Sequence, residues 1–423
     1  MKKCNILRAA VFLTLILTGC ERSLVDMNTD PLRYIAKVLQ VTSEGETKNE
    51  VRNAIARILA IVEFQRVTDC YGDIPYFDGA RGQEDILHPV YDSQEEIYTD
   101  MMVQLKNSIQ KAKTADPSMG YPGADPDYDN NIDKWLRFAN SHRLRLVMRA
   151  RFAAPSASAA IISECMSEPY IETNNGNFGI KYEDSEIPEL YNPWLDVRKH
   201  QNWKMSDKFV EWLKGSSDPG LRTFVDTTKT GEYKRFLNGL NDQEQSRYQW
   251  ENFSNPKPVL CAKYIPLNWM TASEVWFLSA EAALFNLGPG DANQMYREGI
   301  SLNMEQWNVP AGDIDDFLAS SPAASLIGSD EDHFCQTGKQ MWIAFIPDFV
   351  EAWSNIRRTG YPVIPHRTDP TVYALGVTNG VLPKRYKYTS SEYRTNRLNV
   401  VAAVEKREPD LFDTPVWWIV WDK

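Results

Sequence analysis

The stretch from Trp269 to Met304 restricts the fold of this chain more than any other part of its sequence. From Glu274 to Phe285 nearly every residue is small or apolar. The polar exceptions are Glu274, Ser279 and Glu281. The small and apolar residues form two stripes at helical spacing, which predicts a helix that is buried on two sides rather than one lying on a surface.

A second helix is expected after a break at residues 288–290, where Gly-Pro-Gly ends the first one. Asp291 is a plausible N-cap for it. Small and aromatic residues recur across both helices at the spacing of a tetratricopeptide hairpin: Ala280, Ala283, Ala292, Tyr296 and Gly299. The pattern fits either a simple buried helical hairpin or one unit of a helical repeat scaffold.

The start of the chain predicts a lipoprotein. A positively charged beginning is followed by an apolar run at residues 9–17, which is too short to span a bilayer core of about 30 Å, and then by Leu-Thr-Gly-Cys ending at Cys20. We interpret residues 1–19 as a lipoprotein signal peptide and Cys20 as the lipidated N-terminus, with an ordinary signal peptide as the alternative. Residues 20–32 form a tether, and residues 33–423 are expected to form a single domain.

Composition and charge exclude several classes of partner. The net charge is -11 and there is no basic run, which argues against binding to nucleic acid or to an anionic membrane surface. The six cysteines have no CxxC or CxxH grouping, so neither a zinc site nor another cofactor is predicted.

An acidic series could be read as a calcium loop. Its alternating members are Asp125, Asp127, Asp129, Asn131 and Asp133. However, Asn130 stands where an EF-hand needs glycine, and Leu136 stands where its bidentate glutamate would be. We therefore favour a solvated loop and expect no metal.

The remaining periodicity predicts a mainly α fold with an irregular, loop-rich half and a few short strands. Helices are expected at residues 34–41, 50–68, 132–152, 205–213 and 334–357, the last with a kink at Pro347, and another should open at Ser93 with a capping box to Glu96. Short strands fit residues 170–189, and a loop is expected at residues 309–329.

Aromatic residues in turn-rich segments are the candidates for a ligand surface. The chain has 13 Trp and 19 Tyr, which bury area yet keep a polar group for hydrogen bonding. An aromatic ring with amide, carboxylate and Arg groups around it suits a sugar, although core anchors would explain such residues nearly as well. The predicted ligand residues are Tyr71, Tyr76, Tyr191, Asn192, Trp194, Arg198, Trp203 and Trp250.

Several segments together resemble the SusD/RagB family of nutrient-binding outer-membrane lipoproteins, in its starch-binding, SusD-like branch. They are, in the family's order, ARILAIVEFQRVTDCYGDIPY, IDKWLRFANSHRLRLVMRAR, MTASEVWFLSAEAALFNLG, KQMWIAFIPDFVEAWSNIRRTGYP, LPKRYKYTSSEYRTN and VWWIVWDK. The chain departs from the family between the tether and Glu50, where it is shorter than its relatives usually are.

The resemblance implies tetratricopeptide-like helical pairs that support a loop-rich half. It also implies a lipid-anchored protein on the surface of Bacteroidota that binds oligosaccharides, or sometimes peptides, together with a SusC-type TonB-dependent outer-membrane barrel. Members bind and do not catalyse. A glycoside hydrolase would need a carboxylate pair that no pattern here identifies, and a tetratricopeptide scaffold that binds only protein is the third possibility.

Overall fold

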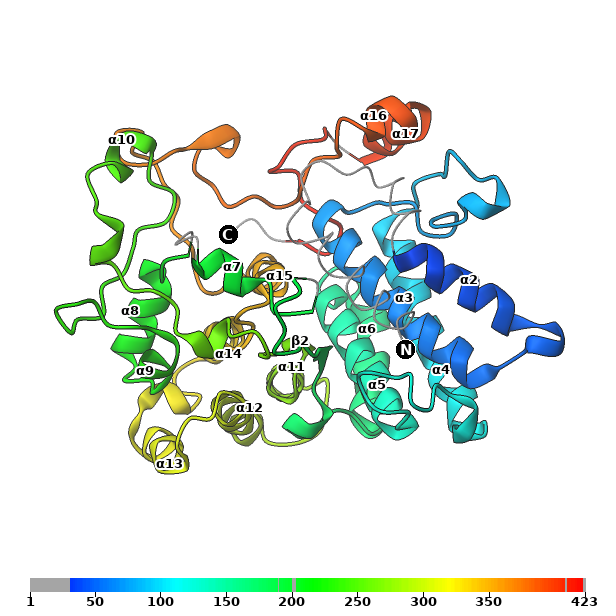
Figure 1. Cartoon of the computed structure of the whole chain (residues 1–423), viewed down its shortest axis with the longest axis horizontal. Coiled ribbons are helices and arrows are strands. Elements are labelled where there is room, and N and C mark those ends of the chain that lie inside the picture. The colour runs from blue at the N-terminus through cyan, green and yellow to red at the C-terminus, as the bar shows by residue number, and fades with distance from the viewer. Residues whose placement is uncertain (1–30, 189, 200–202, 408, 421–423) are drawn as a thin grey trace. The chain divides into compact units, whose positions relative to one another are not determined.

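The computed structural model describes residues 31–188, 190–199, 203–407 and 409–420, and it confirms a mainly α-helical fold (Figure 1). The predicted signal peptide, Cys20 and most of the tether lie outside the described residues. Two compact units are present: a first unit from within Met1–Ile171 and Pro383–Lys423, and a second unit, Glu172–Leu382. None of the described helices is both long enough and apolar enough to cross a membrane.

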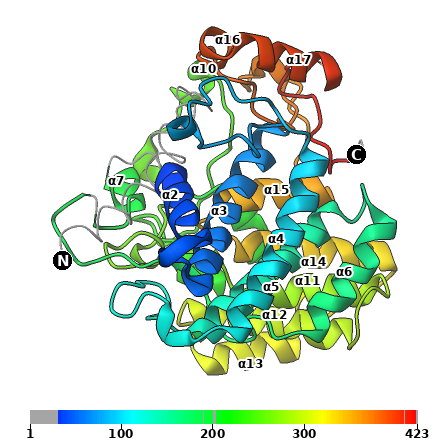
Figure 2. The same cartoon turned by 90° about the vertical axis from the view of Figure 1, so that its right-hand side faces the viewer.

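The first unit is built from consecutive helices, each packed against the next (Figure 2). They are α2 (Pro31–Ser43), α3 (Glu50–Tyr71), α4 (Gln94–Thr114), α5 (Ile132–Ala150) and α6 (Pro155–Ser167), followed near the C-terminus by α16 (Glu392–Thr395) and α17 (Arg397–Arg407). The capping box predicted at the start of α4 is confirmed, with Ser93 and Glu96 each accepting a backbone N–H of the other. Helix α3 continues three residues beyond its predicted end because Gly72, with φ 84°, supplies the cap.

The buried carboxylate of Asp69 joins the C-terminal segment to these helices. It accepts hydrogen bonds from the Tyr98 hydroxyl and from the indole Nε1 of Trp418, the latter at 3.0 Å, and it pairs with the Arg149 guanidinium. A buried charge is tolerated only when it is paired and hydrogen-bonded. The four residues therefore form one unit whose members come from α3, α4, α5 and the chain end.

The second unit contains the predicted helical hairpin and the loop-rich part. Its elements are β1 (Phe178–Ile180), α7 (Trp194–Lys199), α8 (Asp207–Gly215), α9 (Gly220–Phe224), α10 (Asp242–Gln245), β2 (Leu267–Met270), α11 (Ala272–Leu284), α12 (Ala292–Gln306), α13 (Ala311–Ser320), α14 (Asp330–Ala344) and α15 (Phe349–Thr359). Strands β1 and β2 are antiparallel, with Phe178 opposite Met270 and Ile180 opposite Leu267.

The hairpin of α11 and α12 forms as the sequence predicts. Asp291 caps α12 by accepting the backbone N–H of Gln294 at 2.7 Å, and most of α11 is buried. A Cβ atom at Gly299 would lie 2.8 Å from the Phe277 ring, so only glycine allows the two helices this close. Helix α14 packs against α11, and α15 packs against α14.

Two segments differ from the prediction. The expected helix at 334–357 is two helices, because Pro347 has no backbone N–H and Asp348 caps α15 by accepting the N–H of Glu351 at 3.2 Å. The expected loop at 309–329 contains α13, which buries Ile314 and Phe317 on one face. Their i, i+3 spacing is a helical signal that the sequence did contain.

The acidic loop before α5 is organised around one carboxylate. Asp125, which is buried, accepts the backbone N–H groups of Asp127, Tyr128 and Asn130 and the indole Nε1 of Trp135, the last at 2.7 Å. Within the described part of the chain, no three His, Cys, Asp or Glu residues are grouped to hold a metal ion. The described cysteines, Cys70, Cys165, Cys261 and Cys335, are free thiols.

Candidate functional site

Three aromatic rings meet in the second unit and form what we call the aromatic patch: Trp194, Trp203 and Phe349. The ring centroids of Trp194 and Trp203 are 5.2 Å apart, and Phe349 lies edge-on to both, at 5.1 Å from Trp194 and 5.7 Å from Trp203. Edge-to-face and tilted pairs at these distances are favourable because the positive edge of one ring meets the negative face of another. The three rings therefore support each other's orientation.

The positions of the rings follow from local structure. Trp194 begins α7, where the Asn192 side chain accepts its backbone N–H at 2.9 Å. Trp203 rests on a hydrophobic cluster that includes Met205, Phe209 and Ile346. Phe349 is the first residue of α15, and its side chain is 42% exposed.

The patch thus has an anchored side and a side that reaches solvent. Trp194 and Trp203 are half-buried, and Phe349 is exposed. A group of aromatic rings that reaches solvent in this way marks a candidate contact site for a ligand or a partner.

The neighbouring predicted residues mostly hold the turn before α7. Asn192 is fully buried and donates from Nδ2 to the carbonyl of Ile265 at 3.0 Å. The hydroxyl of Tyr191, another buried residue, donates to the Asp196 carboxylate at 2.7 Å. These bonds position Trp194; direct contact of Tyr191 or Asn192 with a ligand stays a prediction.

Arg198 provides a charge beside the patch, one turn after Trp194 on α7. Its Nε donates to the carbonyl of Pro256 at 3.0 Å, and one terminal nitrogen lies 3.5 Å from the Asp226 carboxylate. The guanidinium is half-buried, and it carries five N–H donors. Donors remain on it for the hydroxyl groups of a ligand.

Trp250 belongs to a separate aromatic cluster in the same unit. It stacks on Phe236 with centroids 4.8 Å apart and an interplanar angle of 21°. Lys204, the residue after Trp203, connects the two groups: its ammonium lies 5.9 Å from the Trp250 centroid and donates to Asn255 Oδ1 at 2.6 Å. Burial lowers the pKa of Lys204, and Glu251 acts in the opposite direction.

Tyr71 and Tyr76, the other two predicted ligand residues, lie in the first unit and are more than nine-tenths buried. Tyr71 packs beside Tyr386, with ring centroids 5.8 Å apart, and Tyr76 donates its hydroxyl to Asp100 at 2.8 Å. The pKa of Tyr76 is raised by burial and by Asp100. Their burial leaves little surface for a ligand, and a binding role for them stays a prediction.

Phe349 is the member of the patch that sequence reasoning missed. It lies within the stretch that we expected to continue as a helix through Pro347, where an apolar residue looks like core. The signal was present, since Pro347 followed by Asp348 marks a helix start that leaves the next side chain at the exposed first turn.

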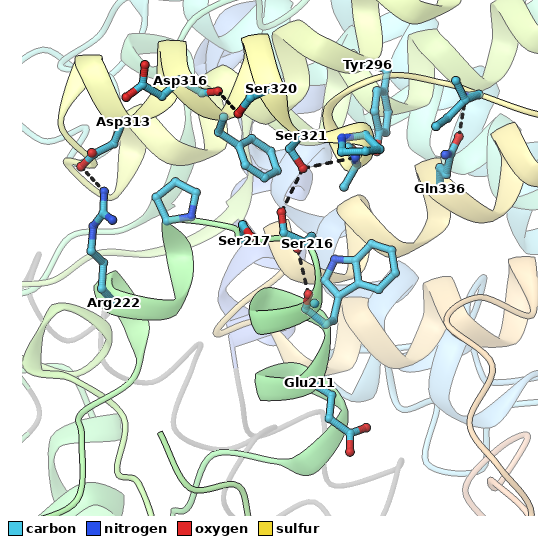
Figure 3. A pocket seen from close by; sticks show the side chains of 17 residues that line it. Glu211, Ser216, Ser217, Arg222, Tyr296, Asp313, Asp316, Ser320, Ser321 and Gln336 are labelled. Carbon is cyan, nitrogen blue, oxygen red and sulfur yellow. Dashed lines mark hydrogen bonds and ion pairs between the residues drawn. The ribbon is translucent and has the colours of Figure 1, made fainter. Parts of the chain in front are cut away.

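A hollow of about 660 Å³ lies elsewhere in the second unit, between α8, α9 and α13 (Figure 3). Some of its polar groups pair with each other: Arg222 pairs with Asp313, and Ser321 donates to the carbonyl of Ser216 at 2.9 Å. Tyr296, which reaches its floor, donates its hydroxyl to the carbonyl of Ala323 at 2.7 Å. The hollow has room for a sugar ring, and the indole Nε1 of Trp212 in its lining has no hydrogen-bond partner among the described residues.

Solved structures similar to this chain include SusD homologues. One, from Bacteroides uniformis, has a TM-score of 0.79 and 30% identity, covering 92% of this chain and 85% of that one. A chitin-binding SusD homologue from Flavobacterium johnsoniae has a TM-score of 0.79 and 25% identity, covering 99% and 93%. A structure described as a chitin-binding protein has a TM-score of 0.82 and 24% identity, covering 94% and 87%.

The comparison with curated proteins gives no match. A family model does match, over residues 21–389, which is most of the chain. Its description is SusD-like, "Starch-binding associating with outer membrane". The chain therefore belongs to this SusD-like family.

Proposed function

We propose that this protein is a cell-surface lipoprotein, anchored through Cys20, that binds oligosaccharides and delivers them to a SusC-type TonB-dependent barrel in the outer membrane. The family description and the chitin-binding relatives support a carbohydrate as the ligand class. The anchor and the barrel partner are proposed from the resemblance and from the sequence around Cys20. The proposed role is capture without chemical conversion of the ligand.

The aromatic patch is the observation that carries the proposal. A pyranose ring has an apolar C–H face that packs well on an indole, and its hydroxyls need hydrogen-bonding groups at the edge of that contact. Trp194 and Trp203 offer the ring surface, and Arg198 on α7 offers donors beside it. We place the glycan on this patch, with Phe349 extending the surface on one side.

The test uses the full chain, purified in detergent, on an array that includes starch and chitin oligosaccharides. Calorimetry then measures the affinity for the best glycan in wild type and in the Trp194→Ala and Trp203→Ala variants. Each is expected to weaken binding at least tenfold, since a tenfold change is about 1.4 kcal/mol and a buried Trp at a contact commonly contributes 2 kcal/mol or more.

Trp212→Ala is the matched control, because Trp212 is also half-buried and in the same unit but lines the hollow of Figure 3. It should bind as wild type does. Unchanged affinity in both patch variants would remove the patch from the site, and loss only in Trp212→Ala would move the glycan to the hollow. Binding of peptides but not of glycans would favour the peptide-binding alternative.

A further inference from the structure

A second cavity, of about 670 Å³, lies in the first unit and is independent of the aromatic patch. Helices α2 and α3 form its walls, with the loop at residues 76–84 and one residue of α4. It is lined by both charged and apolar side chains. Its charges are not balanced, and this imbalance indicates the kind of ligand that it would accept.

The carboxylates at this cavity already have cationic partners. Glu50 pairs with Lys48 at 3.2 Å, and Glu84 pairs with Arg81 at 2.6 Å. Arg57 and Lys111 also line the cavity, and neither has a hydrogen bond or an ion pair from its side chain to any residue that the structure describes. Two positive charges are therefore left over.

Arg57 is the more informative of the two cations. Lys111 is exposed in the last turn of α4, where the helix dipole favours a cation without any ligand. Arg57 is in the interior of α3 and half-buried, so its guanidinium has lost part of its hydration without gaining a hydrogen bond or an ion pair from any described residue. Asp100 accepts hydrogen bonds from the Tyr76 hydroxyl and the Gln104 amide, and among the described residues no ion pair joins it to Arg57.

The rest of the wall is apolar and partly strained. Leu32, Leu39 and Phe64 face the cavity, and the Phe77 ring at its edge is 49% exposed. Ala80, also in the wall, has a φ of 61°, a left-handed conformation that costs a non-glycine residue roughly 1–2 kcal/mol. Strain of this kind is concentrated at ligand-binding loops.

We propose that this cavity binds an organic oxyanion that has an apolar face, such as a carboxylated sugar unit of an acidic glycan. The carboxylate of the ligand would accept two parallel hydrogen bonds from the Arg57 guanidinium, because Arg binds planar oxyanions in this bidentate geometry. Lys111 adds a long-range attraction, and the apolar wall receives the body of the ligand. The choice of a sugar as the body of the ligand rests on the proposed function. The choice of an oxyanion rests only on the charges that line the cavity.

The experiment measures binding of trigalacturonate to the full chain by calorimetry at low salt, with its fully methyl-esterified form as the uncharged probe. Galactose 6-sulfate and glucose 6-phosphate test whether other oxyanions serve. The variants are Arg57→Gln and Lys111→Ala, with Lys113→Ala as the matched control. Lys113 lies on α4 two residues after Lys111, pairs with Glu168 and is not among the residues that line the cavity.

We expect Arg57→Gln to weaken trigalacturonate binding at least tenfold and Lys111→Ala to weaken it a fewfold. Lys113→Ala should change it less than twofold, and the methyl ester should not bind. An Arg57-dependent preference for the sulfate or the phosphate would support the site with another oxyanion. An equal loss in all three variants would overturn the proposal, because it would show only a general charge effect.

A melting temperature provides the second readout. Because the Arg57 side chain has no hydrogen bond or ion pair to any described residue, Arg57→Gln should melt at or above the wild-type temperature; a clear fall would mean a structural role and would also overturn the proposal. Trp194→Ala separates the two sites. If acidic glycans bind and need Arg57, but no neutral glycan binds in a way that needs Trp194, the aromatic patch is refuted and this cavity is not. If neutral glycans bind and need Trp194, but no oxyanion binds in a way that needs Arg57, this cavity is refuted and the patch is not.

Discussion

Replacing Glu281 by glutamine should be one of the most destabilising single changes in this protein. Glu281 is one of the polar exceptions in the apolar stretch of α11, and the structure pairs it with Arg358 of α15. The contact is bidentate, at 2.5 and 2.8 Å, and the two side chains are only 1% and 2% exposed. Arg358 also donates to Asn355 Oδ1 at 3.1 Å.

The magnitude follows from the burial of the pair. Removing one partner of a buried ion pair costs about 3–5 kcal/mol, because the other charge stays buried without compensation. Glutamine keeps one acceptor for Arg358, so we expect a loss of about 3 kcal/mol in the free energy of unfolding. Replacing both residues, as Glu281→Leu with Arg358→Met, removes the charges together and should cost much less than the single change.

The assay is urea unfolding of the full chain followed by circular dichroism at pH 7. Glu298→Gln is the control, since Glu298 is an exposed residue of α12 with no side-chain partner among the described residues. A loss below about 1 kcal/mol in Glu281→Gln would refute the reasoning, as would a double variant at least as unstable as the single one.

Two further predictions concern carboxylates in other places. Burial raises the pKa of Asp218 to about 6, above the value of about 3.9 in an unfolded chain, so the folded state holds this proton more tightly. Raising the pH from 4 to 7 should therefore remove about 2 kcal/mol of stability through this group, and Asp218→Asn should abolish that part of the pH dependence in urea titrations. An unchanged pH profile would contradict the assignment. Asp125→Ala removes the acceptor of four N–H groups, including the Trp135 indole, and should lower the free energy of unfolding by about 3 kcal/mol. Because these donors use the carboxylate, a chelator should leave the melting temperature of wild type unchanged, and a fall on chelation would restore the calcium interpretation.

The elements that the sequence predicts well are those controlled by local interactions. The cap at Ser93 is predicted from Glu96 three residues later, and the cap at Asp291 from the Gly-Pro-Gly break just before it; both helices begin where expected. The small residues of the α11–α12 hairpin, Gly299 above all, also predict close helix packing without knowledge of the rest of the fold. The sequence predicts only a kink at Pro347, whereas the structure has two separate helices, α14 and α15, because the size of the break depends on what packs against each of them.

The candidate sites depend on contacts that join distant parts of the chain. Trp194 and Trp203 are candidates from sequence, but Phe349, more than a hundred residues later, joins them only through tertiary packing. Arg57 looks like any arginine of an amphipathic helix until the structure shows it at a cavity, with no side-chain partner in the described part of the chain. The sequence by itself determined the helices and their capping, because backbone hydrogen bonds and side-chain periodicity act over a few residues. Only the tertiary structure decided which rings share a surface and which charges remain unpaired, because those outcomes depend on which side chains the packed helices bring within a few ångströms of each other.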